Sequence, residues 1–227
     1  MGTEPSQYTV LPVQRSTGLL GDWAGPIWSA AESVEIAHFY DRPQATEHRP
    51  KTEAKLLYSA QGVYLHFRVA DRFVRAVEQG YHSSVCGDSC VEWFVEPVAG
   101  AGYFNLEINA GGTMLLYHIT GRAQNRVMTP VPGEWMDQIL VQHSLPSTVE
   151  PELVGEIIWT IEAFVPFDLF RAMLPGRTVS PSVQGWRCNF YKCGDKTSHP
   201  HWASWQPVGE APFTFHQPNR FAPIIFA

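Results

Sequence analysis

Carboxylates, amides, guanidinium groups and aromatic rings recur at every second position along several runs of this sequence. The polar members of these rows are Tyr64, His66, Arg68, Glu92, Tyr103, Asn105, Glu107, Asn109, Thr160, Glu162, Arg187, Asn189 and Tyr191. Residues two apart on a strand lie on the same face of a sheet, so these side chains are expected to gather on shared faces. Fixed hydrogen-bonding groups beside apolar ring faces suit a hydroxyl-rich ligand, and such a surface would bind carbohydrate.

The same rows have a simpler interpretation as the solvated outer face of a sheet. Arginines and glutamates on neighbouring strands form cross-strand pairs, each contributing roughly 0.2–1 kcal/mol. The sequence leaves both interpretations open for most of these residues.

The elements that would position the rows are predicted to be strands. Val91, Trp93 and Val95 alternate with Cys90, Glu92, Phe94 and Glu96, so Trp93 is expected to be buried. Strands are predicted in the runs 54–58, 63–70, 90–96, 102–109, 114–119, 138–145, 157–165, 185–192 and 220–226. Short helices are predicted at 168–173, after Pro166, and at 28–35. The stretches 122–134 and 146–156 are predicted to be loops.

Turn-forming dipeptides separate these runs and favour antiparallel pairing. Gly-Gly at 111–112 and Pro-Gly at 132–133 and 175–176 are examples. Many short strands joined by turns favour two sheets packed face to face. The predicted fold is an all-β antiparallel sandwich, immunoglobulin-like or jelly-roll-like, with few short helices.

Composition limits the class of protein. The chain has 227 residues, 44% hydrophobic and 17% charged, which fits one folded domain over residues 1–227. A net charge of −6 without a basic run argues against nucleic acid. The absence of an apolar stretch approaching about 20 residues argues against a membrane span.

Residues 1–13 lack an export signal, so we expect a cytoplasmic protein, or an exported one if the sequence is truncated. The oligomeric state is not indicated.

The four cysteines and the loop acids were considered as metal ligands. Cys86 and Cys90 are four apart and Cys188 and Cys193 five apart, so neither pair has zinc-knuckle spacing, although His199-Pro200-His201 follows. We expect free thiols, because reducing conditions prevail in the cytoplasm. Calcium could take oxygen ligands from Asp22, Asp41 and Glu47, for which turn or capping roles are the simpler alternative. No organic cofactor is predicted.

Two glutamates on adjacent strands could formally act as an acid and base pair. Glu92 with Glu107 or Glu162 would be such a pair, but ion pairing with Arg68 or Arg187 explains these glutamates more simply. The sequence holds no Gly-x-Ser-x-Gly elbow, phosphate loop or dinucleotide motif. A catalytic role is not predicted.

Four segments in order resemble family 9 carbohydrate-binding modules, which are sandwiches of the DOMON-like kind. They are Gly87 to Val95, Tyr103 to Asn109, Trp186 to Asp195 and Ala203 to Val208. The ends are similar too, with Asp22-Trp23 and Trp28 near the start and 215–218 and 221–226 at the finish. The resemblance covers most of the chain. It implies a non-catalytic β-sandwich that grips a sugar, often a chain end, and often holds structural calcium.

The resemblance also implies which residues contact the sugar. Glu92 would be the carboxylate, Asn109 the amide and Trp205 an aromatic wall, with Glu107, Arg187 and Tyr103 also in the site. The sequence departs from the family pattern at two places. Val85-Cys86-Gly87 stands where a tryptophan is expected, and Glu107 stands where a basic residue is expected. Residues that could replace the missing ring are Tyr81, His82, Trp93 and Trp135.

Two other functions stay open for a sandwich of this kind. The sugar site could have decayed, leaving an interaction or structural module. DOMON-like sandwiches also include haem proteins, and Met114 and His118 share one face of a predicted strand, with Met128 and Met136 nearby. Core packing of the methionine and surface exposure of the histidine are the simpler interpretation. A sugar-binding module would be associated with a glycoside hydrolase in carbohydrate catabolism.

Overall fold

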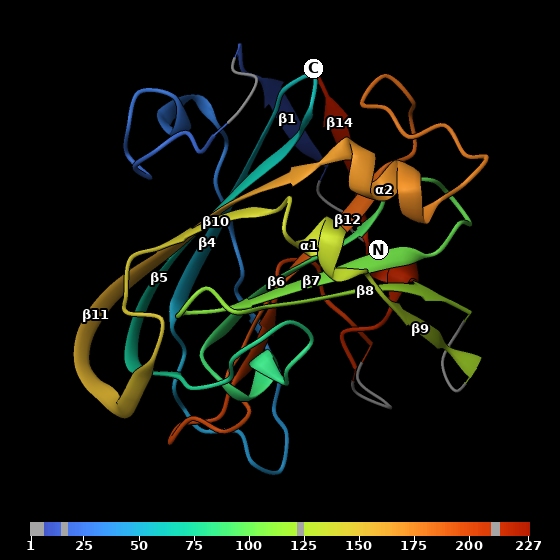
Figure 1. The fold of residues 1–227 in the computed structure, drawn as a ribbon. Helices are drawn as coiled ribbons and strands as arrows, with labels where there is room; N and C mark the ends of the chain where they lie inside the picture. Colours follow the sequence, from blue (N-terminus) through green and yellow to red (C-terminus); the bar gives the residue numbers. More distant parts are fainter. Residues whose placement is uncertain (1–6, 15–17, 122–124, 210–213) are drawn as a thin grey trace, which may run out of the picture.

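A computed structural model describes residues 7–14, 18–121, 125–209 and 214–227, and most of the ordered elements are strands (Figure 1). The strands are β1 (Tyr8–Pro12), β2 (Val34–Glu35), β3 (His38–Phe39), β4 (Lys51–Tyr58), β5 (Gly62–Ala76), β6 (Cys90–Glu96), β7 (Tyr103–Asn109), β8 (Met114–Thr120), β9 (Val127–Pro130), β10 (Leu140–His143), β11 (Val149–Pro166), β12 (Arg187–Cys193), β13 (Trp202–Ser204) and β14 (Ala222–Phe226). The helices are α1 (Gly133–Met136) and α2 (Phe167–Met173), and 3-10 turns lie at Trp28–Ala30, Val85–Gly87 and Pro218–Arg220.

The strands form two layers that share a continuous pairing path through β1. One layer has the order β10-β11-β5-β4 with β2 beside β4. The other has the order β14-β12-β6-β7-β8-β9, with β13 beside β12 and β3 beside β13. β1 pairs with both β4 and β14 and so joins the layers. The pairing is antiparallel except at β1, whose two ladders are parallel, which the turn-based prediction did not include.

The main core lies between the two layers and follows the predicted alternation. Val91, Trp93 and Val95 of β6 point into this core, and Trp93 is buried as predicted. Phe67 of β5 and Phe190 of β12 meet edge to face at 5.9 Å between ring centroids, which shows that the layers pack face to face. The prediction of an all-β sandwich is therefore confirmed.

Helix α2 begins directly after Pro166, as predicted, and buries Phe167, Leu169 and Phe170 against the core. The other predicted helix is only a single 3-10 turn, followed by β2. The predicted loops were partly wrong. Residues 127–130 form β9, and β11 begins at Val149, because exposed polar ends of strands carry no apolar alternation for the sequence to reveal.

The outer faces of both layers are partly covered, so the polar rows predicted to be wet are largely buried. His66 and Glu162 lie beneath the segment that carries Trp28, and each is 3% exposed. Glu92 and Glu107 line a pocket together with the chain around 214–216, and they are 3% and 7% exposed. Alternation identified which residues share a face, but the fully solvated interpretation of these faces was wrong.

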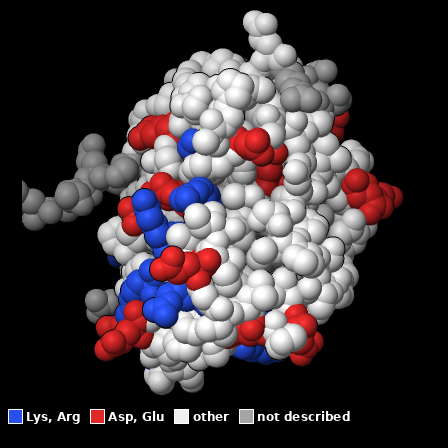
Figure 2. Space-filling view, turned by 90° about the vertical axis from the view of Figure 1, so that its left-hand side faces the viewer, with Lys and Arg blue, Asp and Glu red and all other residues white. Residues whose placement is uncertain are grey.

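Charged side chains on the face shown in Figure 2 are of both signs. Lysines and arginines gather toward one side of this face with acidic residues among them, and much of the remaining surface is uncharged. In the described ranges, no helix is both long enough and apolar enough to span a membrane.

Candidate functional site

A pocket of about 210 Å³ opens on the covered face of the β6–β7 layer. Its walls come from β6, β7, β12 and β13, and from four further segments at Arg42, Cys86, Asp195 and 214–216. The residues that line it are Arg42, Cys86, Glu92, Phe94, Glu107, Cys193, Asp195, Trp202, Thr214, Phe215 and His216. Carboxylates, a guanidinium group, thiols and aromatic rings therefore meet in one depression.

Two carboxyl groups lie side by side at this pocket because strand register opposes them. Glu92 of β6 is the cross-strand partner of Glu107 of β7, and the Asn105 amide donates a hydrogen bond of 2.9 Å to Glu107 Oε1. Burial and the Glu107 carboxylate raise the pKa of Glu92 well above its usual range. Burial also raises the pKa of Glu107 to about 7. The Glu92–Glu107 pair is therefore partly protonated near neutral pH. In that state the pair can donate as well as accept hydrogen bonds.

An aromatic ring and a cation stand beside the carboxyl pair. The indole Nε1 of Trp202 donates a hydrogen bond of 2.6 Å to Asp195 Oδ1, which fixes the ring plane. The Arg42 guanidinium lies over this ring, 4.1 Å from its centroid, in a cation–π contact. His216 closes another side, and its Nδ1 is 2.8 Å from the Tyr103 hydroxyl.

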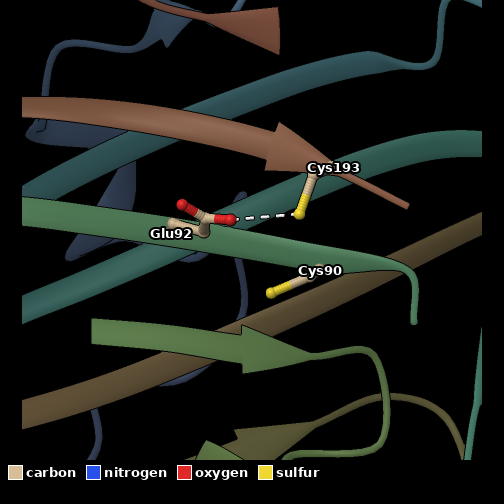
Figure 3. A group of neighbouring side chains, drawn as sticks. All are labelled: Cys90, Glu92 and Cys193. Carbon is tan, nitrogen blue, oxygen red and sulfur yellow. Dashed lines mark hydrogen bonds between the residues drawn. The ribbon is translucent and has the colours of Figure 1, made fainter. Parts of the chain in front are cut away.

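The Cys90 and Cys193 thiols and the Glu92 carboxylate converge (Figure 3), and two of these residues, Glu92 and Cys193, line the pocket. Cys90 and Cys193 are cross-strand partners of β6 and β12, and the Cys193 thiol donates to Glu92 Oε1 at 3.0 Å. Cys86, Cys90, Cys188 and Cys193 are all free cysteines, as expected from the sequence. Burial raises the pKa of Cys90 to about 12, so this thiol is protonated in the metal-free protein.

Of the six residues predicted to contact a ligand, the structure brings Glu92 and Glu107 together in the pocket wall. Tyr103 is buried behind the wall and reaches it through His216. Arg187 lies at the opposite end of β12 from Cys193, where it donates to the Phe221 carbonyl oxygen at 2.7 Å. Arg187 does not line the pocket, because register places it beside Glu96, at the other end of the β6–β12 ladder from Cys193.

Asn109, predicted to be the amide that contacts the sugar, does not line the pocket and is hydrogen-bonded within the fold. Its amide nitrogen donates to Asp88 Oδ2 at 2.9 Å and to the Glu78 carbonyl oxygen at 3.2 Å. Its side-chain oxygen accepts from the backbone of Gly111 and Thr113. All of these groups hold the turn between β7 and β8, so the amide has little capacity left for a sugar.

We expect Asn109→Ala to lower the free energy of unfolding by about 1–3 kcal/mol, because it leaves buried partners without their hydrogen bonds. Urea denaturation of the variant and the wild type measures this difference. Asn219→Ala removes an exposed amide and should leave stability close to that of the wild type. An Asn109 variant as stable as the wild type would contradict the structural role.

Trp205 was predicted to be an aromatic wall, and the structure places it in the core instead. It is 7% exposed and packs against Phe190 and Tyr8, with ring centroids 5.6 and 6.4 Å apart. The tryptophan at the pocket is Trp202, three residues earlier. Positions three apart on extended chain face opposite sides, so only one of the two can face the pocket.

The residues proposed to replace the missing ring lie elsewhere. The lining residues include neither Tyr81, His82, Trp93 nor Trp135. Tyr81 donates to Asp137, and His82 Nε2 lies 3.0 Å from the Val131 carbonyl oxygen. Phe94, which shares a face with Glu92, and His216 supply rings that the sequence did not single out. The parity of the β6 run could have indicated Phe94.

The suggested calcium ligands are not gathered by the fold. Among the described residues, the His, Cys, Asp and Glu side chains that lie close enough together to hold a metal ion are Cys90, Glu92 and Cys193. Asp22, Asp41 and Glu47 are not among them. The Asp22 carbonyl oxygen accepts from Gly25, and Asp41 pairs with exposed Arg49. These acids do not fit a shared calcium site, and calcium at another position stays a prediction.

The haem ligands suggested by sequence do not fit either. Met114 is buried in the main core, and His118 Nε2 lies 2.8 Å from the Ala101 carbonyl oxygen. The Met114 thioether is packed among core side chains, and the His118 ring is engaged by the backbone, so neither side chain is presented to a haem.

The architecture and the pocket define a class of protein, a β-sandwich binding domain with a polar and aromatic pocket on one sheet. The family model for carbohydrate-binding family 9 matches residues 34–226, and the chain belongs to this family. A search of curated proteins finds no match.

Solved structures agree with this assignment. A proposed carbohydrate-binding protein from Bacteroides uniformis is 28% identical, with a TM-score of 0.82 and coverage of 97% of this chain and 99% of that one. A family 9 module from Caldicellulosiruptor kristjanssonii in complex with cellotriose is 11% identical, with a TM-score of 0.61 over 97% of this chain and 93% of that one. The same module with glucose is also 11% identical, with a TM-score of 0.61 over 98% and 96%. At 11% identity, the similarity to that module concerns the fold.

Proposed function

We propose that this protein binds carbohydrate in the pocket formed by Glu92, Glu107, Trp202 and Arg42, without transforming it. The observation that carries the proposal is the buried Glu92–Glu107 pair set beside the Trp202 ring and the Arg42 guanidinium. Paired acceptors, a fixed cation and an apolar ring are the chemistry that orients sugar hydroxyls. Family membership supports the same ligand class.

The size of the pocket favours a single sugar ring, such as a free monosaccharide or the end of a chain. Its volume of about 210 Å³ is below the roughly 300–1,000 Å³ of pockets that enclose drug-sized ligands. Trp202 is only 4% exposed and its indole N–H is engaged by Asp195, so it offers a ring edge rather than a wide stacking platform. Hydrogen bonds to the carboxyl pair therefore supply most of the specificity.

Binding without catalysis is proposed because the two carboxyl groups have similar environments. Acid and base pairs in glycosidases sit in environments that push their pKa values apart. Here burial raises the pKa of both Glu92 and Glu107. A partnership with a glycoside hydrolase in carbohydrate catabolism stays a prediction.

The test is calorimetric titration with glucose, cellotriose and a panel of other monosaccharides. We expect Glu107→Gln to change the order of sugar preference, because its carboxyl group directs hydrogen bonds to the sugar. Trp202→Phe should weaken the best sugar about tenfold or more, because it removes the buried hydrogen bond to Asp195 that orients the ring, and a broken buried hydrogen bond costs about 1–3 kcal/mol. Tyr81→Ala serves as the control because this exposed ring lies outside the pocket.

Two results would contradict the proposal. The first is binding of a sugar that neither pocket variant alters. The second is failure of every sugar to bind, which would favour a module whose sugar site has decayed.

A further inference from the structure

A cluster of two thiols and one carboxylate lies beside the pocket, where sugar binding does not account for the thiols. Cys90 Sγ, Cys193 Sγ and a Glu92 carboxylate oxygen all lie within 4.8 Å of one another (Figure 3). The three residues are buried. We propose that Cys90, Cys193 and Glu92 form a binding site for a thiophilic divalent cation, with Zn²⁺ as the ion that fits best.

The donor set matches the preferences of zinc. Zn²⁺ takes Cys sulfur at about 2.3 Å and carboxylate oxygen at about 2.0–2.2 Å in tetrahedral geometry, which places two sulfur ligands about 3.8 Å apart. The observed spread of at most 4.8 Å needs only small side-chain rotations to reach these distances. Thiolate ligands select against Ca²⁺ and Mg²⁺, which prefer oxygen.

The sheet holds the three side chains in place before any ion arrives. Cys90 and Cys193 are opposed in the β6–β12 ladder, and Glu92 follows two positions after Cys90 on the same face of β6. Ligands on strands are positioned more precisely than ligands on loops. The Cys193 thiol already donates to Glu92 at 3.0 Å, and a bound cation would take the place of that proton.

A cation could reach the cluster from the pocket, and the three protein ligands leave a fourth coordination position for a water molecule. Glu92 and Cys193 line the pocket, so a hydrated ion can reach the cluster from that side. Glu92 forms no ion pair with another described residue, so a divalent cation would displace no ion-paired cation from this carboxyl group. Three protein ligands leave a fourth position for water, as in open zinc sites.

The test uses the full-length chain, reduced and stripped of metal with a chelator, and titrated with Co²⁺ alone. We expect thiolate-to-cobalt charge-transfer absorption that saturates at one equivalent and disappears when Zn²⁺ is added. Cys90→Ala and Cys193→Ala should each weaken Co²⁺ binding about 100-fold or more, since even second-shell changes cost 10–100-fold. Cys188→Ala is the matched control, because this buried cysteine lies in the core away from the cluster.

A second measurement does not depend on variants that fold. Saturating Zn²⁺ should protect Cys90 and Cys193 of the wild type from alkylation, read by peptide mapping, and should raise the melting temperature. Absence of thiolate absorption, equal Co²⁺ affinity in the Cys90, Cys193 and Cys188 variants, or a Cys90–Cys193 disulfide in the purified protein would each overturn the proposal. Sugar binding is tested through Glu107 and Trp202, so either proposal can fail without the other.

Discussion

Replacing Asp71 by alanine is expected to lower the free energy of unfolding by about 3–5 kcal/mol, because it leaves the buried Lys192 ammonium group without its counter-ion. Asp71 of β5 lies 3.8 Å from Lys192 Nζ of β12, and both side chains are fully buried. His48 Nε2 lies 2.7 Å from the same carboxylate. The variant would leave the Lys192 ammonium inside the sandwich without its counter-ion.

Asp71 also organises the chain around it. Its Oδ1 accepts backbone hydrogen bonds from Arg72 and Phe73 of β5. Burial alone would raise the pKa of Asp71, but Lys192 and the hydrogen bond with His48 outweigh burial and hold the pKa well below its usual range. Asp71 therefore stays ionised, and its stabilising contribution disappears only in strong acid.

Lys192 has two further neutral partners, the Cys193 carbonyl oxygen, which accepts from Nζ at 2.9 Å, and the His201 ring. His201 Nδ1 lies 2.8 Å from the His199 carbonyl oxygen and its Nε2 lies 2.7 Å from Lys192 Nζ. This arrangement assigns the proton of neutral His201 to Nδ1, so that Nε2 accepts from the ammonium group. A histidine acceptor cannot neutralise the lysine, so Asp71 is the group that balances its charge.

Urea denaturation measures the Asp71 effect, and two further variants test its cause. Asp71→Ala with Lys192→Met should recover part of the lost stability, because the unpaired charge is then removed. Asp41→Ala should change stability little, since the Asp41 side chain is 96% exposed in its pair with Arg49. A double variant less stable than Asp71→Ala alone would show that the lost packing, rather than the buried charge, sets the cost.

The main core could be predicted from sequence because strand alternation depends only on local spacing. Val91, Trp93 and Val95 point into the sandwich as the period of two requires. The same period put Glu92 and Phe94 on the opposite face, where they do lie. Alternation says nothing of what packs over that second face, and so the burial of Glu92 could not be predicted.

The pocket depends on contacts between segments far apart in the sequence. Cys90 meets Cys193 through the register of β6 with β12, which no spacing between neighbouring residues reveals. β13 has three residues, too few for a period, so the sequence could not distinguish Trp202 from Trp205. Asn109 ends a strand, and only the turn geometry shows that its amide is fully used.

Acidification from pH 6.5 to pH 4 is expected to destabilise the protein through His66, by up to about 3 kcal/mol for this residue. His66 lies on β5 between the rings of Trp23 and Trp28, with ring centroids 5.2 and 5.0 Å away. Its cross-strand neighbours are Lys55 and Glu162. Burial, assisted by the charge of Lys55, lowers the pKa of His66 to about 4.

The direction of the effect follows from which state binds the proton. An unfolded histidine titrates near pH 6.5, so between that pH and about 4 the unfolded chain binds a proton that folded His66 does not. The stability contributed by neutral His66 is therefore complete above about pH 6.5 and falls as the pH drops through this window. Comparing His66→Gln with the wild type isolates this term, because the other histidines titrate in both proteins.

Urea denaturation at pH 7 and pH 4 gives the difference. The unfolding free energy of the wild type minus that of His66→Gln should fall by about 3 kcal/mol between these two pH values. His38→Gln removes an exposed histidine and should keep the pH profile of the wild type. If the unfolding free energies of the wild type and His66→Gln change equally with pH, folded His66 takes up its proton as readily as the unfolded chain does. Water would then reach His66 between the Trp23 and Trp28 rings.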